Sequence, residues 1–153
     1  MRAIHLITTI SLFAGCVEII DGPGQEELLL NADFVDFVEQ VQPILDARCA
    51  NPLCHGNSER PLEVYSVHQH RINPIHTYLD GELTEEELWR NFERACSFLT
   101  EIEDPDDCAI LEKPLSEEAG GGEHGGGTQF QDKSTQDYQT IRDWISNHDL
   151  EGL

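Results

Sequence analysis

Apolar residues recur at intervals of three and four in three stretches of the chain, which is the period of an α-helix with one buried face. The stretches run from Phe34 to Leu45, from Leu88 to Leu99 and from Tyr138 to Ile145. Pro43 lies inside the first stretch and should kink that helix or end its first half. The segments between the stretches show no strand pattern, so we expect a mainly α fold.

Short local patterns mark where two of these helices begin. Thr84 and Glu87 have the spacing of a capping box, and Ser134 with Asp137 is a similar start signal for the last helix. Residues 85–87 are all glutamate and are expected to be a solvated first turn. Four aromatic residues are expected to pack in the core: Tyr78, Trp89, Tyr138 and Trp144.

Long irregular segments, 56–83 and 105–133, hold most of the prolines and glycines. The hydrophobic fraction of 39% and the aromatic fraction of 7% are low for a chain that must bury a core. Extra cross-links or a bound cofactor would help such a chain to fold. We therefore expect the long loops to wrap around a ligand.

The N-terminal segment has the features of a bacterial export signal. Arg2 is followed by an apolar run from Ile4 to Ala14, which is too short to span a membrane stably. Phe13-Ala14-Gly15-Cys16 is similar to a lipobox, in which the cysteine is lipidated. We predict a signal peptide at residues 1–15, a lipidated Cys16 opening an acidic tether at 16–30, and a domain at 31–150. The protein would lie in the cell envelope, facing the periplasm or the cell surface.

Export places the remaining cysteines in an oxidising compartment, where thiols tend to be bonded. Cys49 and Cys54 belong to a motif with a neighbouring histidine, which leaves Cys96 and Cys108 to pair in a disulfide. Zinc ligation by Cys96 and Cys108 is the alternative.

The formal net charge of −21 limits the choice of partners. An acidic surface repels nucleic acid and anionic lipid, so membrane contact is expected only through the lipid anchor. The charge could steer a basic redox protein into contact, or could serve solubility in a salty medium.

Residues 48–56 read RCANPLCHG and carry the candidate chemistry. Two thiols followed by a histidine are what a covalent c-type haem site requires, although the spacer between these thiols has four residues where two are usual. Asn51-Pro52 is a turn-forming pair that can absorb the longer spacer, and Gly56 lets the main chain leave without a side chain against the ring.

Other motifs follow in a recognisable order. The run 37–49 reads FVEQVQPILDARC and leads into Cys54-His55-Gly56, and Lys113-Pro114, His124-Gly125-Gly126-Gly127 and Trp144-Ile145 come later. Together, over about residues 34–148, they resemble the cytochrome c-like domains of exported bacterial proteins. The resemblance implies a small helical domain around one haem c, held covalently by Cys49 and Cys54, with His55 as the proximal iron ligand. Its function would be electron transfer between proteins rather than enzyme catalysis.

The sixth iron ligand cannot be methionine, because Met1 is the only one and lies in the signal. His124 is the first candidate, since glycines on both sides let its main chain approach a flat ring. His68 and His70 are next, with the adjacent Arg71 able to pair with a haem propionate. His76, His148 or an open position complete the choices, and an open position would favour peroxide or gas chemistry.

Two haem-free interpretations remain open from the sequence. In one, Cys49 and Cys54 form a disulfide in a cell-surface binding module derived from a cytochrome scaffold. In the other, Cys49, Cys54 and His55 bind zinc together with His68 or His70.

Overall fold

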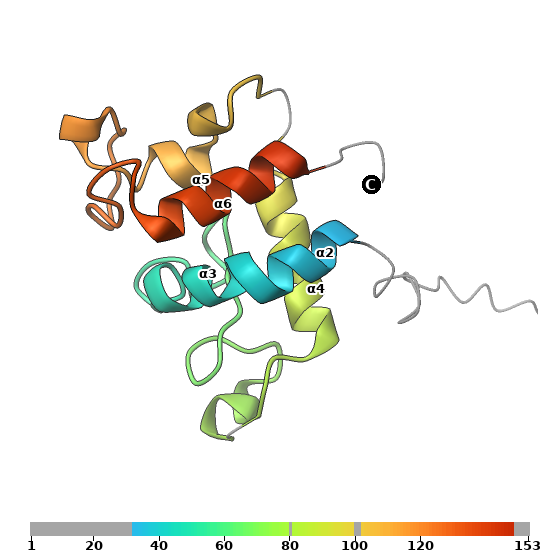
Figure 1. Cartoon of the computed structure of the whole chain (residues 1–153). Coiled ribbons are helices and arrows are strands. Elements are labelled where there is room, and N and C mark those ends of the chain that lie inside the picture. Colours follow the sequence, from blue (N-terminus) through green and yellow to red (C-terminus); the bar gives the residue numbers. More distant parts are fainter. Residues whose placement is uncertain (1–31, 80, 100–101, 149–153) are drawn as a thin grey trace, which may run out of the picture.

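The computed structural model describes residues 32–79, 81–99 and 102–148 (Figure 1). The predicted signal peptide, the predicted lipidation site Cys16 and the predicted tether lie outside these residues. The described helices, with π-helical and 3-10 segments labelled η, are α2 Ala32–Asp36, η1 Phe37–Val41, α3 Gln42–Arg48, η2 Pro74–Tyr78, α4 Glu85–Cys96, η3 Pro105–Asp107, α5 Ala109–Glu112, η4 Glu117–Ala119 and α6 Gln136–Asn147. The described part of the chain contains no strand, only isolated bridges, so the expectation of a mainly α fold is confirmed.

The first helical region continues through Pro43 with a change of hydrogen-bond register. η1 is a π-helix, and the N–H of Gln42 donates to the carbonyl of Phe37, five residues earlier. Proline cannot supply an N–H and crowds the preceding turn, and the wider π turn lies directly before it. The expected break at Pro43 is therefore a local π turn between α2 and α3.

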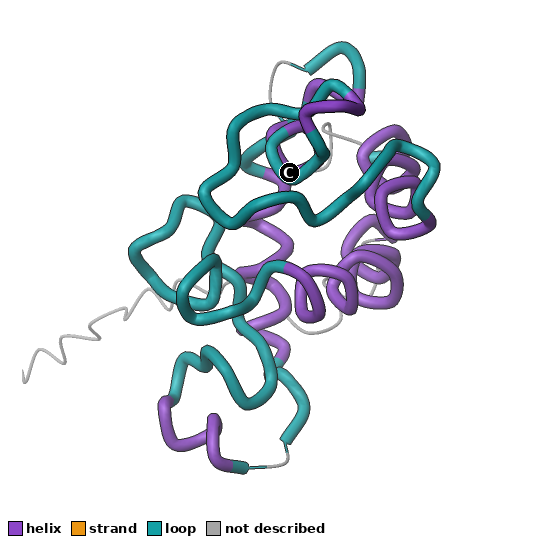
Figure 2. The backbone as a smooth tube through the Cα atoms, turned by 90° about the vertical axis from the view of Figure 1, so that its left-hand side faces the viewer, coloured by secondary structure: helices purple, strands orange, loops and turns teal. Residues whose placement is uncertain are grey.

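Aromatic side chains from the three predicted helical regions form the centre of the core. The Phe37 and Phe92 rings lie 5.6 Å apart edge to face, and Phe37 also contacts Trp144 at 5.4 Å. These contacts join η1, α4 and α6, which run close together in Figure 1. Figure 2 shows most of the loops gathered to one side of the helices. Tyr138 is fully buried as expected, but Tyr78 is 86% exposed, so its assignment to the core was wrong.

The capping box at the start of α4 is confirmed, with both reciprocal hydrogen bonds between Thr84 and Glu87 present. Glu87 is nevertheless fully buried, so the expectation that residues 85–87 form a solvated turn was wrong for this residue. Its carboxylate accepts bonds of 2.9 and 2.8 Å from Arg71, which also donates to the carbonyls of Gly81 and Glu82. This buried pair fixes the loop before α4, and it removes Arg71 from any role at a haem propionate.

The start of α6 differs slightly from the sequence prediction. The helix begins at Gln136, and its N-cap Thr135 makes no side-chain capping bond. Ser134 instead donates to Asp132, and Asp137 pairs with Arg48. A tertiary ion pair has replaced the expected cap.

The predicted disulfide between Cys96 and Cys108 is not present, because both are buried free thiols. Each thiol has a different neighbour. Cys108 Sγ lies 3.6 Å from the carbonyl of Phe98, in hydrogen-bond contact. Burial raises the pKa of Cys96 to about 12, and the nearby Asp33 carboxylate acts in the same direction. Both thiols therefore lie buried in the core.

The Arg71–Glu87 pair should dominate the acid sensitivity of this fold. Burial by itself would raise the pKa of Glu87, but bonds from Arg71, Thr84 and Ile72 outweigh it and lower the pKa to about 2. The stabilisation is therefore complete above pH 4.5, the ordinary value, and is lost as the pH falls from 4.5 to about 2. Glu87→Gln should lower the free energy of unfolding by about 3–5 kcal/mol at pH 7. It should also weaken the loss of stability between pH 4.5 and about 2.

Urea unfolding at several pH values measures both effects, with Glu86→Gln as the matched control. Glu86 pairs with Arg90 on the surface of the same helix. Losing this exposed pair should lower the free energy of unfolding by less than about 1 kcal/mol. Equal costs for the two variants would contradict the importance assigned to the buried pair.

Candidate functional site

The RCANPLCHG motif folds into a tight turn directly after α3. The carbonyl of Asn51 accepts from the N–H of Cys54 at 2.7 Å and of Gly56 at 3.0 Å, and its side chain accepts from the N–H of Leu53. The N–H of His55 donates to the carbonyl of Cys49 at 3.1 Å. The expectation that Asn51-Pro52 forms a turn within the longer spacer is confirmed, and Cys49 is brought back beside His55.

Gly56 is required by the packing of this turn. A Cβ added at Gly56 would lie 2.0 Å from the carbonyl oxygen of Ala50, which is too close for any side chain. Glycine therefore allows the main chain after His55 to cross directly against residue 50.

The His55 ring is held in one orientation by the main chain. Its Nδ1 lies 2.8 Å from the carbonyl oxygen of Leu62, so this nitrogen carries the proton and donates. Burial lowers the pKa of His55; the Leu62 bond opposes this, while the positive charges of His124 and Arg60 add to it. The ring is thus neutral at pH 7, with Nε2 left as a lone-pair donor for a metal.

The carbonyl that orients His55 belongs to a buried segment, residues 62–66, which lacks regular structure. Asn91 on α4 accepts from the N–H of Tyr65 at 2.8 Å and donates to its carbonyl at 2.8 Å. Gln42 on α3 accepts from Asn91 at 2.9 Å. Neither Asn91 nor Gln42 was predicted from the sequence, although Asn91 occupies a polar position on the apolar face of α4, four residues before Ala95.

Hydrogen bonds at Gln129 and Phe130 hold the end of the glycine-rich loop that carries His124. The N–H groups of Gln129 and Phe130 donate to the carbonyl of Pro114 at 2.8 and 3.0 Å. Arg48, which directly precedes Cys49, donates to the Gln129 carbonyl at 3.1 Å and to Asp137 at 2.6 Å. One arginine therefore links the end of α3 to the loop that carries His124.

His124 is oriented in the same manner as His55. Its Nδ1 lies 2.8 Å from the carbonyl oxygen of Gly127, whose own N–H donates back to the carbonyl of His124 at 2.9 Å. Gly127 closes this small ring with φ of 72°, a left-handed conformation that suits glycine.

The structure brings the two predicted axial histidines together. The ring centres of His55 and His124 lie 6.1 Å apart and the ring planes differ by 12°. Each Nδ1 is bound to a carbonyl, and neither Nε2 has a hydrogen-bond partner within the described ranges.

The contacts recorded for the other histidines of the described chain are with residues outside this pair. His70 binds Glu63 at 2.8 Å and stacks on Tyr65, and His68 contacts the carbonyl of Thr77 at 3.3 Å. His76 lies within η2. The His148 side chain is buried against Phe92 and Trp144, and its Nδ1 lies 3.3 Å from Asp33. The histidine that lies beside His55 is thus His124, the first of the sequence candidates.

Two cavities share His55 and His124 in their walls. One has a volume of about 200 Å³ and is lined by Leu53, Cys54, His55, Arg60, His124, Gly125 and Gly126. The other has about 210 Å³ and is lined mainly by apolar groups: Cys49, His55, Pro61, Leu62, Phe98, Ala109, Ile110, Lys113, Pro114 and His124. Each is smaller than the roughly 300–1,000 Å³ typical of small-molecule sites, and the two share His55 and His124 as lining residues.

Each cavity contains one cysteine of the motif. Burial raises the pKa of Cys49 to about 12, with the charge of Arg48 opposing the shift, so the thiol is protonated. Cys49 and Cys54 are both free in the structure, which lacks the disulfide of the haem-free interpretation. The two thiols that could attach a haem therefore line the cavities around the histidine pair.

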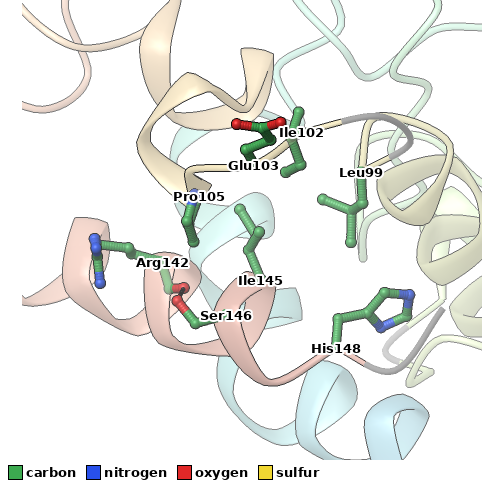
Figure 3. A pocket seen from close by; sticks show the side chains of 8 residues that line it. All are labelled: Leu99, Ile102, Glu103, Pro105, Arg142, Ile145, Ser146 and His148. Atoms are coloured by element: carbon green, nitrogen blue, oxygen red, sulfur yellow. Dashed lines mark hydrogen bonds between the residues drawn. The ribbon is translucent and has the colours of Figure 1, made fainter.

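Another cavity does not include His55 or His124 in its lining (Figure 3). It has a volume of about 340 Å³, and Leu99, Ile102 and Ile145 converge on it. Arg142 points away from them and is bound to Asp106 at 2.9 Å. We therefore place the candidate site at the smaller cavities around His55 and His124.

A bare metal ion has too few protein ligands at this site. Across residues 32–79, 81–99 and 102–148 there is no group of three His, Cys, Asp or Glu residues arranged to hold a metal. The zinc alternatives need three or four protein ligands, so this geometry does not fit them.

In comparisons with known proteins, no family model, curated protein or solved structure matches the chain. None of the helices in the described residues is long and apolar enough to span a membrane.

The packing at Gly56 yields a direct test. Gly56→Ala should lower the free energy of unfolding by about 1–3 kcal/mol, because the new methyl group collides with the Ala50 carbonyl. Gly125→Ala is the control, since a Cβ there meets nothing within 4 Å. Thermal unfolding of both variants checks this, and a Gly56→Ala protein as stable as Gly125→Ala would be inconsistent with the turn described.

Proposed function

We propose that this chain is a monohaem c-type cytochrome that carries electrons, with His55 and His124 as axial ligands and Cys49 and Cys54 as covalent anchors. The observation that carries the proposal is the histidine pair. Its two imidazoles lie 6.1 Å apart, and main-chain carbonyls hold each Nδ1 so that both Nε2 atoms remain available.

The number of protein ligands favours haem over a bare ion. A porphyrin supplies the other ligands of its iron, so a pair of axial histidines is sufficient. The site offers such a pair and no third ligand group within the described residues. A cysteine lines each of the cavities on which the pair borders, as covalent attachment requires.

The residues around the site have distinct roles in this proposal. The Leu62 and Gly127 carbonyls set the tautomer of each histidine, which strengthens Nε2 as a ligand. Pro61, Leu62, Phe98 and Ile110 provide the apolar wall that limits water. The bound haem would supply one-electron chemistry at a potential lower than that of a histidine–methionine cytochrome.

Two histidine ligands also favour electron transfer over catalysis. With both axial positions filled by protein, no position is left for peroxide or a gas molecule. The proposal therefore includes no catalytic residue, and peroxide chemistry would require His124 to leave.

The location and partner belong to the same proposal. Lipidation at Cys16 after export would anchor the protein to a bacterial membrane, facing the periplasm or the cell surface. The net charge of −21 favours a basic redox partner and disfavours nucleic acid.

Covalent attachment can be tested on denatured protein made in a host with cytochrome c maturation. The wild-type band should keep its haem stain on a gel, and Cys54→Ala should lose most of it. Cys96→Ala is a matched control, because this thiol does not line either cavity of the site. An unstained wild-type band would refute the cytochrome proposal.

Axial ligation by His124 has a separate spectroscopic test. The wild type should be low-spin, and His124→Ala should become high-spin while the haem stays attached. His70→Ala should remain low-spin, because His70 is bound to Glu63. A spin change in His70→Ala rather than in His124→Ala would overturn the ligand assignment, and a high-spin wild type would exclude the bis-histidine site.

A further inference from the structure

Most cations of this acidic chain are neutralised by a carboxylate. The sequence has 30 acidic and 9 basic residues, so a carboxylate partner is easy to find. The described ion pairs of lysine and arginine are Arg48–Asp137, Arg71–Glu87, Arg90–Glu86, Lys133–Asp106 and Arg142–Asp106.

Arg60, Arg94 and Lys113 are the cations of the described chain that have no carboxylate partner. Arg60 lines the cavity that contains Cys54, and Lys113 lines the cavity that contains Cys49. Neither cavity has an aspartate or glutamate in its wall. Two cations without a carboxylate partner in the described residues thus line the cavities beside the histidine pair of a strongly negative protein.

These two cations would be unfavourable beside a bare metal ion. Like charges in a partly buried site repel one another, and each cation of this pair lines a cavity that also contains His55 and His124. The repulsion becomes attraction if the ligand that holds the metal brings its own negative groups. Haem is such a ligand, because its porphyrin carries a pair of propionate carboxylates.

We propose that Arg60 and Lys113 bind the carboxylates of the ligand and make the site selective for an anionic porphyrin. This inference rests on the proposed function. Arg71, the cation that the sequence suggested for this role, is committed to Glu87 instead.

The geometry of each cation suits this role. Arg60 donates to the carbonyls of Cys54 at 3.2 Å and Leu53 at 3.4 Å, which holds it against the motif and leaves other N–H groups free. Lys113 is exposed and makes no side-chain bond within the described residues. A hydrogen bond between such a cation and a carboxylate is among the stronger ones in proteins.

The test compares a porphyrin with free carboxylates against one without them. Full-length chain made without haem maturation is titrated with iron protoporphyrin IX and with its dimethyl ester, following the absorption of the bound porphyrin. The wild type should prefer the free acid. Arg60→Gln and Lys113→Gln should each weaken free-acid binding about tenfold and leave ester binding unchanged.

Arg94→Gln is the matched control, because Arg94 also lacks a carboxylate partner but lies on α4 outside both cavities. Lys113→Arg, which keeps the positive charge, should retain the preference for the free acid that Lys113→Gln loses. In the matured protein, loss of either site cation should lower the reduction potential more than Arg94→Gln does, since a positive charge nearby disfavours the oxidised iron.

The possible failures can be told apart. If the wild type binds acid and ester equally, or if the site variants behave like Arg94→Gln, this inference is wrong while the cytochrome proposal stands. If the wild type binds neither porphyrin and carries no haem after maturation, both are wrong.

Discussion

The main chain of residues 62–66 is buried without a helix or a sheet to satisfy its polar groups, and this constraint organises the molecule. Buried N–H and carbonyl groups must find partners, because leaving one unpaired costs about 1–3 kcal/mol. The Asn91 side chain binds both main-chain groups of Tyr65, and Gln42 also donates to the Tyr65 carbonyl. The His55 ring donates to the carbonyl of Leu62, and the His55 carbonyl accepts from the N–H of Val64. The bonds that make this segment possible are the same ones that orient the candidate ligand.

The second half of the site depends on a comparable arrangement in the glycine-rich loop. This loop has little apolar surface to bury, so hydrogen bonds at its base and within its tip define its path. Arg48, the last residue of α3, donates a hydrogen bond to the Gln129 carbonyl at that base, and its guanidinium also lies 5.6 Å from the ring centre of Phe130. The two histidines therefore come from loops that are far apart in sequence. Arg48 connects them, because it ends α3 directly before the His55 turn and binds both Gln129 and, on α6, Asp137.

Several parts of this arrangement follow from local patterns. The three apolar stripes, the capping box of Thr84 and Glu87, and the turn at Asn51-Pro52 depend on neighbours within a few residues. Other parts depend on partners that are distant in the sequence. Glu87 is buried because Arg71 reaches it, and Asp137 leaves its capping role because Arg48 binds it.

The sequence by itself determined the helical class and the motif with its thiols and histidine. Composition, periodicity and short spacings are sufficient for these conclusions. Only the tertiary structure decided which histidine lies beside His55 and which cations of the described residues have no carboxylate partner. The physical reason is that an irregular loop has no period, so its path is set by the distant hydrogen bonds and charges that fasten it.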